Sequence, residues 1–417
     1  MDSLVFFTEA QVREVQRAFG TPVYVYDERT FERRAREMLA FPNAYGLTVR
    51  YAMKALSSRA VLRLFDALGL HIDASSGFEA ERALRAGIAP EKVQITAQEP
   101  PRDLKGLVEQ GVRFNACSIH QLDEYGKLFP GAEVSVRINP GLGSGHSNRT
   151  NVGGPSSSFG IWHEHLDYVL GRAARHGLRL TRMHTHIGSG TDPETWLHCA
   201  RLSLAIAARM PEVTLLSLGG GFKVARMPDE CSADVREIGG RIAAEFERFA
   251  REHGRELHLE VEPGTYLVAN AGALVCTAID VVDTGPDGFR FLKLDAGMTD
   301  IMRPSMYGAW HPIVVVPASD APRGAASYIV AGHCCESGDI LTPERGNPEG
   351  LAPRELREAA IGDAVVIEGA GAYCAAQCAK NYNSFPEAPE VLLTKAGEFR
   401  LIRRRQTMEQ MLENEIE

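Results

Sequence analysis

The stretch VRYAMKALSSRAVLRLFDALGLHIDASSGFEAERALRA, residues 49–86, decides the fold class of this chain. It holds two short apolar runs, Val49–Ala52 and Leu70–Asp73, each followed by a helical pattern, Ser58–Leu68 and Phe78–Ala86. A strand followed by a helix and then another strand is the order of parallel β-sheets with crossover helices. The segment therefore predicts the first two units of an α/β fold.

The same alternation continues to about residue 265. Six further runs read as strands: Val93–Thr96, Val112–Ala116, Val134–Ile138, Leu180–Ile187, Val213–Leu218 and Leu257–Glu262. Eight such units in succession predict a parallel (β/α)8 TIM-like barrel. A doubly wound open sheet is the alternative, but no dinucleotide fingerprint follows the first strand.

After residue 266 the helical alternation stops and strand-like runs separated by turn residues take over. These runs are Leu274–Val282, Phe291–Leu294, Ile313–Val316, Tyr328–Ala331, Ala364–Glu368, Val391–Thr394 and Phe399–Ile402. They predict a second, mostly β domain of barrel or sandwich type. The early run Pro22–Tyr26 is also strand-like, so we expect residues 1–29 to join the β domain of residues 266–417, around a barrel of residues 30–265.

Composition restricts the partners and the compartment. The 45 Lys and Arg against 54 Asp and Glu give a net charge of −9, which argues against a nucleic-acid partner. No signal peptide and no apolar run long enough for a membrane span stand out, and the eight scattered cysteines form no disulfide framework or convincing zinc pattern. We therefore expect a cytoplasmic protein with no metal, no membrane partner and a small-molecule substrate.

Polar or glycine residues stand at nearly every carboxyl end of the eight expected strands. They are Lys54, Asp73, Asn115, Arg137, His186, Gly219–Gly221 and Glu262. In a (β/α)8 barrel these ends converge on the catalytic face. Each residue has an ordinary reading as a surface lysine, a core histidine or a strand-end ion pair, but seven such positions on one rim favour a functional site.

The chemistry of this set suggests a phosphorylated aldehyde cofactor. Three glycines after a strand allow backbone N–H groups to surround a phosphate. A lysine in the same rim forms a Schiff base with an aldehyde, and a carboxylate keeps a pyridinium nitrogen protonated. Pyridoxal 5′-phosphate (PLP) fits these groups, and a Schiff-base aldolase fits nearly as well.

Ordered motifs along both expected domains carry a family resemblance. They are YAMKA (51–55), HIDASSGFEAERAL (71–84), VRINPG (136–141), GHSNRTNVGGPSSSFGIW (145–162), HTHIGSG (184–190), LGGGF (218–222), EPGT (262–265), DAGMTDIMRPSMYGAWH (295–311), CCESGD (334–339) and GAYCAAQCAKNYNS (371–384). None is specific alone, but together they resemble the fold-type III PLP-dependent decarboxylases and, within them, the diaminopimelate decarboxylase family. The resemblance implies a PLP-dependent carboxy-lyase that converts meso-2,6-diaminopimelate to L-lysine and CO2 in lysine biosynthesis.

The resemblance also implies roles for individual positions. Lys54 matches the lysine that binds PLP covalently, His186 the histidine on one cofactor face, and Glu262 the partner of the ring nitrogen. Further cofactor contacts are implied for Asp73, Arg137, Ser189, Gly219, Gly220, Gly221, Gly264 and Tyr373. Cys335 matches a proton donor that reaches the active site from the other subunit of a homodimer. Contacts with the substrate are implied for Arg303, Tyr307, Glu336 and Tyr373.

One departure leaves the substrate open. Many family members have arginine after Glu-Pro-Gly, where this chain has Thr265, which brings a hydroxyl but no charge. The alternatives are a decarboxylase of the same fold for D-lysine, D-ornithine or a carboxylated polyamine, an alanine racemase-like enzyme, and a non-catalytic PLP-binding regulatory protein. The racemases are less similar because they pair the ring nitrogen with arginine.

Overall fold

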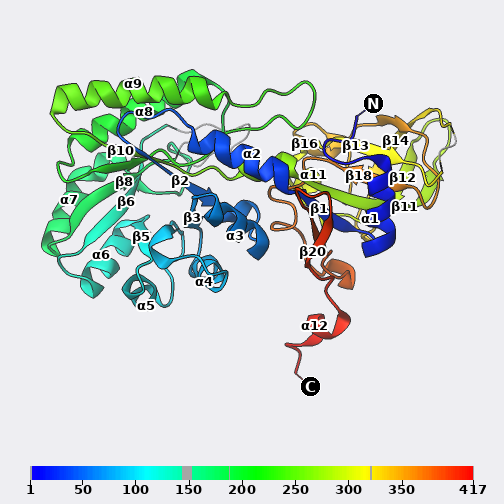
Figure 1. The fold of residues 1–417 in the computed structure, drawn as a ribbon, viewed down its shortest axis with the longest axis horizontal. Coiled ribbons are helices and arrows are strands. Elements are labelled where there is room, and N and C mark those ends of the chain that lie inside the picture. The colour runs from blue at the N-terminus through cyan, green and yellow to red at the C-terminus, as the bar shows by residue number, and fades with distance from the viewer. Residues whose placement is uncertain (1, 143–152, 187, 320–321, 417) are drawn as a thin grey trace. The chain divides into compact units, whose positions relative to one another are not determined.

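The computed structural model describes residues 2–142, 153–186, 188–319 and 322–416. The chain forms two compact units (Figure 1). One comprises residues 32–224 and 231–267, and the other comprises residues 1–31, 225–230 and 268–417. Among the described residues, no helix has the length and apolar character needed to cross a membrane.

The first unit is a closed barrel of eight parallel strands. In spatial order these are β5 (Arg113–Ala116), β4 (Val93–Ile95), β3 (His71–Ala74), β2 (Leu47–Ala52), β10 (His258–Val261), β9 (Leu215–Ser217), β8 (Arg179–His184) and β6 (Glu133–Asn139). Pairing of β5 with β6 closes the ring, and the two-residue β7 (Ile161–Trp162) adds to β6. The predicted barrel and its eight strands are confirmed.

A helix follows each barrel strand in the chain. These helices are α3 (Arg59–Ala67), α4 (Gly77–Arg85), α5 (Leu104–Glu109), α6 (Ile119–Leu128), α7 (Leu166–Arg175), α8 (Pro193–Ala208), α9 (Val235–His253) and α10 (Thr265–Val268). Figure 1 shows α8 and α9 side by side on the outside of the barrel.

Short polar residues cap the starts of several barrel helices. Ser76 and Ser118 cap α4 and α6, each accepting a hydrogen bond from the backbone N–H three residues later. Asp234 caps α9 in the same way. Such caps satisfy N–H groups that a helix start leaves without partners. The starts of α4, α6 and α9 are therefore fixed by the polar residue that precedes each helix.

The second unit is built around a β-sheet. Its strands are β1 (Val23–Asp27), β11 (Gly272–Asp283), β12 (Arg290–Leu294), β13 (Ile313–Val316), β14 (Ala325–Ala331), β17 (Arg354–Arg357), β18 (Ala364–Ile367), β19 (Glu390–Leu393) and β20 (Phe399–Arg403). The path runs β17-β14-β12-β11-β1-β19-β20, and β18 pairs with β11 and β13. A separate hairpin joins β15 (Pro343–Glu344) to β16 (Asn347–Leu351).

The N-terminal segment is part of this second unit. β1 pairs antiparallel with β11 and parallel with β19, which lies more than 350 residues further along the chain. The preceding helix α1 (Glu9–Phe19) has a capping box of Thr8 and Gln11, and it buries Val12 and Val15 against the sheet. Helix α2 (Glu28–Leu39) then leads into the barrel, and α11 (Arg303–Tyr307) and α12 (Met408–Leu412) are short helices of the later chain.

Candidate active site

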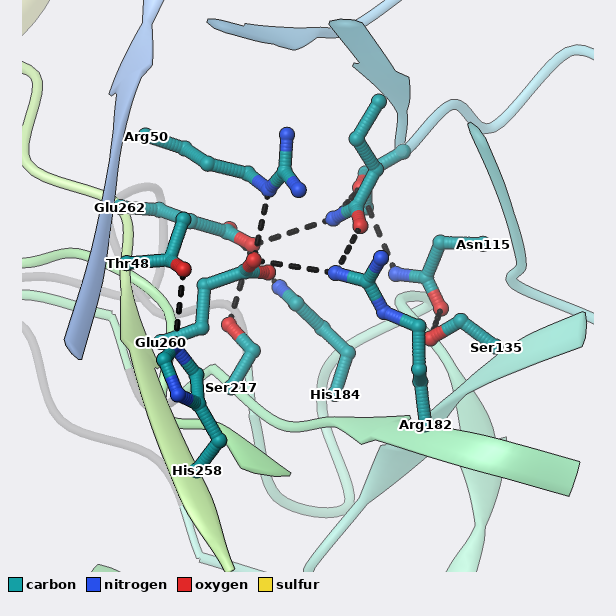
Figure 2. A network of polar contacts seen from close by, with 12 residues as sticks. Thr48, Arg50, Asn115, Ser135, Arg182, His184, Ser217, His258, Glu260 and Glu262 are labelled. Atoms are coloured by element: carbon teal, nitrogen blue, oxygen red, sulfur yellow. Dashed lines mark hydrogen bonds and ion pairs between the residues drawn. The ribbon is translucent and has the colours of Figure 1, made fainter. Parts of the chain in front are cut away.

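Glu262 directly follows β10 and lies at the centre of a buried polar network (Figure 2). Its Oε2 is 2.8 Å from His184 Nε2, and its Oε1 accepts hydrogen bonds from Ser217 Oγ at 3.0 Å and from Gln94 Nε2 at 3.4 Å. Burial alone would raise the pKa of Glu262, but the charge and hydrogen bond of His184, with the hydroxyl of Ser217, lower it to about 2. Glu262 is therefore a carboxylate at neutral pH.

Asp73 and His186 are two further titratable groups near this carboxylate. Burial and the negative charge of Glu262 raise the pKa of Asp73 well above its ordinary value, and Lys54 opposes this in part. Burial and the positive charges of Arg137 and Lys54 hold the pKa of His186 well below its ordinary value. His186 is consequently a neutral imidazole, which suits a ring that packs against another flat ring.

The three glycines after β9 pack too closely for any side chain. A Cβ on Gly220 would lie 2.2 Å from the carbonyl oxygen of Glu262, and one on Gly221 would lie 2.0 Å from the carbonyl oxygen of Gly188. Gly219 and Gly221 also have φ values of +69° and +106°, which disfavour other residues. The loop therefore brings bare backbone to the rim of the barrel, as a phosphate cradle requires.

Lys54 lies in a short 3₁₀ turn, Met53–Ala55, directly after β2, and its side chain is exposed. The backbone N–H of Ala52 donates to the carbonyl of Pro263 at 3.1 Å, which ties this turn to the segment after Glu262. Gly264 packs there against Ala52 and Ala55 at ordinary contact distance. Lys54 and the carboxylate thus belong to neighbouring strand ends.

The other site residues predicted in the barrel lie on or shortly after its strands. Arg137 is buried in β6, with its guanidinium 4.9 Å from the centre of the Phe159 ring. Ser189 is partly buried after β8. Asn115 lies deeper, between Thr96 and Ser135, where it has an evident structural role. Residues 145–152 of the GHSNRTNVGGPSSSFGIW motif, and Ile187, lie outside the described residues.

A second group of predicted site residues lies in the β unit. Arg303 begins α11, and its Nε is 3.4 Å from His311 Nε2; Tyr307 OH accepts a hydrogen bond from Gln377 at 3.2 Å. Tyr373 has a φ of +56°, an uncommon conformation for a bulky residue. Burial, with the charge of Arg303, lowers the pKa of Arg226 to about 9. The interaction of Tyr373 with Arg226 acts in the opposite direction and raises that pKa.

Cys335 and Glu336 occupy one exposed turn of the same unit. The backbone N–H of Cys335 donates to Asn383 Oδ1 at 2.9 Å. Glu336 accepts from the backbone N–H of Gly338 at 3.1 Å. Asn383, from the motif at residues 371–384, therefore helps to hold this turn.

Sequence reasoning missed the residues that hold Glu262, namely Gln94, His184 and Ser217. His184 was part of a quoted motif but received no role. Strand periodicity carries the signal. His184 and Arg182 on β8 are two residues apart, as are Glu260 on β10 and Glu262 directly after it, so each pair continues one face of its strand. Polar residues that alternate along a strand in this way indicate a layer of side chains that faces the barrel interior.

The barrel residues fit PLP. Buried atoms Oδ1 of Asp73 and Nδ1 of His186 have no hydrogen-bond partner among the described residues. A lysine amine, an ionised carboxylate, a neutral imidazole and a glycine cradle that excludes side chains all meet at one end of the barrel. These groups match the parts of PLP in turn: the lysine suits the aldehyde, the carboxylate suits the protonated ring nitrogen, the imidazole suits the flat ring, and the glycine backbone suits the phosphate.

Comparisons with known proteins agree with that chemistry. Residues 29–269 match the family described as pyridoxal-dependent decarboxylase, pyridoxal binding domain. The chain is 40% identical to the diaminopimelate decarboxylase of Streptomyces coelicolor, covering 95% of this chain and 90% of that protein. It is 38% identical to that of Escherichia coli K12, covering 95% and 94%.

Solved structures give the same result. A crystal structure of diaminopimelate decarboxylase superposes with a TM-score of 0.90 at 37% identity, covering 97% of this chain and 96% of that one. A lysine/ornithine decarboxylase from Vibrio vulnificus shares the fold, with a TM-score of 0.77 at 19% identity. Barrel, site and relatives together show that the chain belongs to the PLP-dependent decarboxylases, in the family of the diaminopimelate decarboxylases, and that it is a carboxy-lyase with pyridoxal 5′-phosphate as cofactor.

Proposed function

We propose that this chain decarboxylates meso-2,6-diaminopimelate to L-lysine and CO2, the reaction that serves lysine biosynthesis. The observation that carries the proposal is 40% identity to a diaminopimelate decarboxylase over 95% of the chain, which includes both units. Sequence similarity confined to the barrel would support only the cofactor. Here it extends through the β unit, where the expected substrate residues lie.

Bound PLP supplies a ring that accepts the electron pair released when CO2 leaves. In the proposed assignment Lys54 Nζ would hold the cofactor covalently through its aldehyde carbon. Glu262, ionised because its pKa is about 2, keeps the proton on the ring nitrogen and so preserves the electron-accepting form. Neutral His186 covers one face of the ring and brings no competing positive charge.

The remaining cofactor contacts follow from local structure. We assign the phosphate to Gly219–Gly221, Ser189 and Tyr373. Asp73, Arg137 and Gly264 line the same site, and the bare backbone around Gly220 supports this assignment because a Cβ there would meet the carbonyl of Glu262. In domain terms, we assign PLP binding to the barrel of residues 30–265, flanked by residues 1–29 and 266–417 of the β domain.

For the substrate we assign the distal carboxylate to Arg303 and Tyr307, with Tyr373 nearby in the site, and the distal ammonium to Glu336. Cys335 delivers the proton to the carbon that has lost CO2. Its thiol lies on an exposed turn, which leaves it accessible to a second subunit. We therefore propose a homodimer with shared active sites, acting in the cytoplasm.

A CO2-release panel tests the substrate directly. Wild-type protein saturated with PLP is offered meso-diaminopimelate, D-lysine, D-ornithine and carboxynorspermidine at equal concentrations. We expect kcat/KM for meso-diaminopimelate to exceed the others by about a hundredfold or more. CO2 release that is greatest with D-lysine would leave the decarboxylase class standing but remove this substrate.

A further inference from the structure

Gln94 lies between the site carboxylate and a buried arginine. It belongs to β4, is 1% exposed, and its amide Nε2 faces Glu262 Oε1 at 3.4 Å. On the other side its Oε1 accepts a hydrogen bond from Arg182 Nη2 at 2.9 Å. Figure 2 shows Arg182 and Glu262 in one polar network. The amide of Gln94 bonds to both of them.

Arg182 fixes which end of the amide faces Glu262. A guanidinium only donates hydrogen bonds, so the amide must present its oxygen to Arg182 and its NH2 group to the carboxylate. An amide rotated by half a turn would place oxygen against carboxylate oxygen and nitrogen against guanidinium nitrogen. Both contacts would be repulsive, so the chemistry of the neighbours sets this orientation.

Arg182 is itself held in place by a buried carboxylate. It donates to Glu260 Oε2 at 2.9 Å, and the same oxygen accepts from Arg50 Nε at 2.7 Å. Arg50 and Glu260 are almost wholly buried, at 1% and 0% exposure. In such surroundings a charge polarises the next hydrogen bond, so Arg182 strengthens the N–H that Gln94 offers to Glu262.

We propose that Gln94 is a positioning residue for the decarboxylation, which keeps Glu262 oriented and ionised by presenting it with an N–H donor of fixed orientation. The inference rests on the proposed role of Glu262. The contact of 3.4 Å is longer than the 2.8 Å bond from His184, so we expect Gln94 to contribute less than His184 does.

Two substitutions separate this role from packing. Gln94→Glu keeps the shape and the contact with Arg182 but turns an acceptor toward Glu262. Gln94→Met removes the donor and leaves an apolar side chain of similar length. A packing role predicts that Gln94→Glu is the milder change, whereas the positioning role predicts that it is the more severe one.

The expected pH effect has a definite sign. The charged and titratable groups near Glu262 come from several strands and are Lys54, Asp73, Arg182, His184, His186 and Glu260. A second carboxylate added at position 94 disfavours the ionised form of the pair, so one proton is retained to higher pH. In the wild type the acid limb of PLP affinity lies near pH 2, because the pKa of Glu262 is about 2. It should therefore move up by about four pH units in Gln94→Glu and by less in Gln94→Met.

Gln121 offers a matched control in the same unit. It is a buried glutamine whose amide binds the carbonyls of Ala97 and Gln98, and its Oε1 accepts from the backbone of Cys117. Gln121→Met therefore loses buried amide bonds without any contact with Glu262. Its thermal unfolding temperature should fall while its pH dependence of PLP affinity stays that of the wild type.

The experiment titrates PLP by fluorescence into the full-length apo forms from about pH 5 to 9 and records thermal unfolding alongside. The inference predicts PLP affinity at the low end of this range weakened about tenfold in Gln94→Glu, less in Gln94→Met, and unchanged in Gln121→Met. A milder effect in Gln94→Glu than in Gln94→Met would overturn it. If Gln94→Glu does not fold, Gln94→Met against Gln121→Met decides, and equal PLP affinities overturn the inference.

The proposed role of Glu262 is checked separately with Glu262→Gln in the same titration. An unchanged pH profile in that variant would remove the role of Glu262 itself. A changed profile in Glu262→Gln with a wild-type profile in both Gln94 variants would leave that role standing and remove only the inference about Gln94.

Discussion

His184 Nε2 and Glu262 Oε2 lie 2.8 Å apart, and the two side chains are 1% and 5% exposed. Their strands, β8 and β10, are separated in the barrel by β9, so both side chains reach across the interior. The pair is the main reason that the pKa of Glu262 falls to about 2 in spite of burial. Since that pKa is depressed, ionised Glu262 stabilises the folded chain above its unfolded pKa of about 4.5, and this contribution is lost as the pH falls toward 2.

Replacing His184 with Phe should raise the pKa of Glu262 and weaken PLP binding. Hydrogen bonds to charged groups contribute about 1.5–3 kcal/mol, which corresponds to a dissociation constant about ten- to a hundredfold higher. Fluorescence titration at neutral pH measures this. His176→Phe is the control because His176 pairs with Asp123 at 3.2 Å on the helices outside the barrel. Equal losses in both variants would contradict the special role of His184.

Lys54→Ala should abolish covalent attachment of PLP while the chain still folds. Reduction of the wild type with borohydride, followed by peptide mass spectrometry, should place the cofactor on Lys54. Lys92→Ala is the control, since Lys92 forms an ion pair with Asp66 at 2.6 Å and has no part in the proposed site. A reduced adduct on any other lysine would show that the assignment is wrong.

The buried ion triad of Arg50, Glu260 and Arg182 should be important for stability. Glu260→Leu leaves two buried guanidinium groups without their carboxylate, and breaking a buried pair costs about 3–5 kcal/mol. Urea unfolding of the apo form measures the free energy of unfolding. Glu133→Leu, which removes an exposed ion pair with Arg179, should cost about 1 kcal/mol or less. A similar cost in the two variants would contradict the argument.

Much of the fold could be predicted from the sequence because strands and helices differ in hydrophobic period. The strand Ile313–Val316 has the same bounds in the structure as in the prediction. The helix predicted at Phe78–Ala86 is displaced by only one residue, to Gly77–Arg85. The strand Arg354–Arg357 was missed because its sequence, RELR, has the polar composition of a loop. It pairs at the edge of the sheet with β14, where polar side chains are tolerated.

The site could be predicted only in part, for a related reason. A polar residue at the carboxyl end of a predicted strand can be recognised from the local sequence. The sequence therefore identifies Lys54, Asp73 and Glu262 as site residues. Gln94 lies in the middle of a predicted strand, and its partner Glu262 is 168 residues away. That contact depends on the closure of the barrel, which brings the interior faces of non-adjacent strands together, and no local pattern encodes it.

The proposed sharing of active sites between subunits leads to a complementation experiment. Lys54→Ala and Cys335→Ala proteins should each be inactive because each lacks one contribution to every site. After subunit exchange, the mixture should recover up to about a quarter of the wild-type activity, since random pairing restores that fraction of sites. No recovery, with exchange demonstrated by a labelled subunit, would place Cys335 in the site of its own subunit.

The proposed substrate choice depends on Arg303, whose Nε lies 3.4 Å from His311 Nε2. Burial and the charges of Arg226 and Arg303 keep the pKa of His311 well below its ordinary value, so the ring is neutral. Its Nδ1 lies 2.9 Å from the carbonyl of Glu368, which makes Nδ1 the protonated nitrogen and leaves Nε2 to accept from Arg303 at 3.4 Å. A histidine fixed in this tautomer holds the guanidinium for a bidentate contact with a carboxylate.

Diaminopimelate presents such a carboxylate at its distal end, whereas D-lysine presents only the ammonium. With D-lysine the guanidinium of Arg303 would be desolvated without a partner, at a cost of a few kcal/mol, or about a hundredfold or more in kcat/KM. Arg303→Met should therefore abolish turnover of meso-diaminopimelate while PLP affinity stays within about twofold of the wild type. Arg357→Met is the control, because Arg357 pairs with Glu9 at 2.9 Å elsewhere in the β unit. Full activity of Arg303→Met would show that Arg303 only supports the fold, and wild-type turnover of D-lysine equal to that of meso-diaminopimelate would remove the distal carboxylate from the recognition.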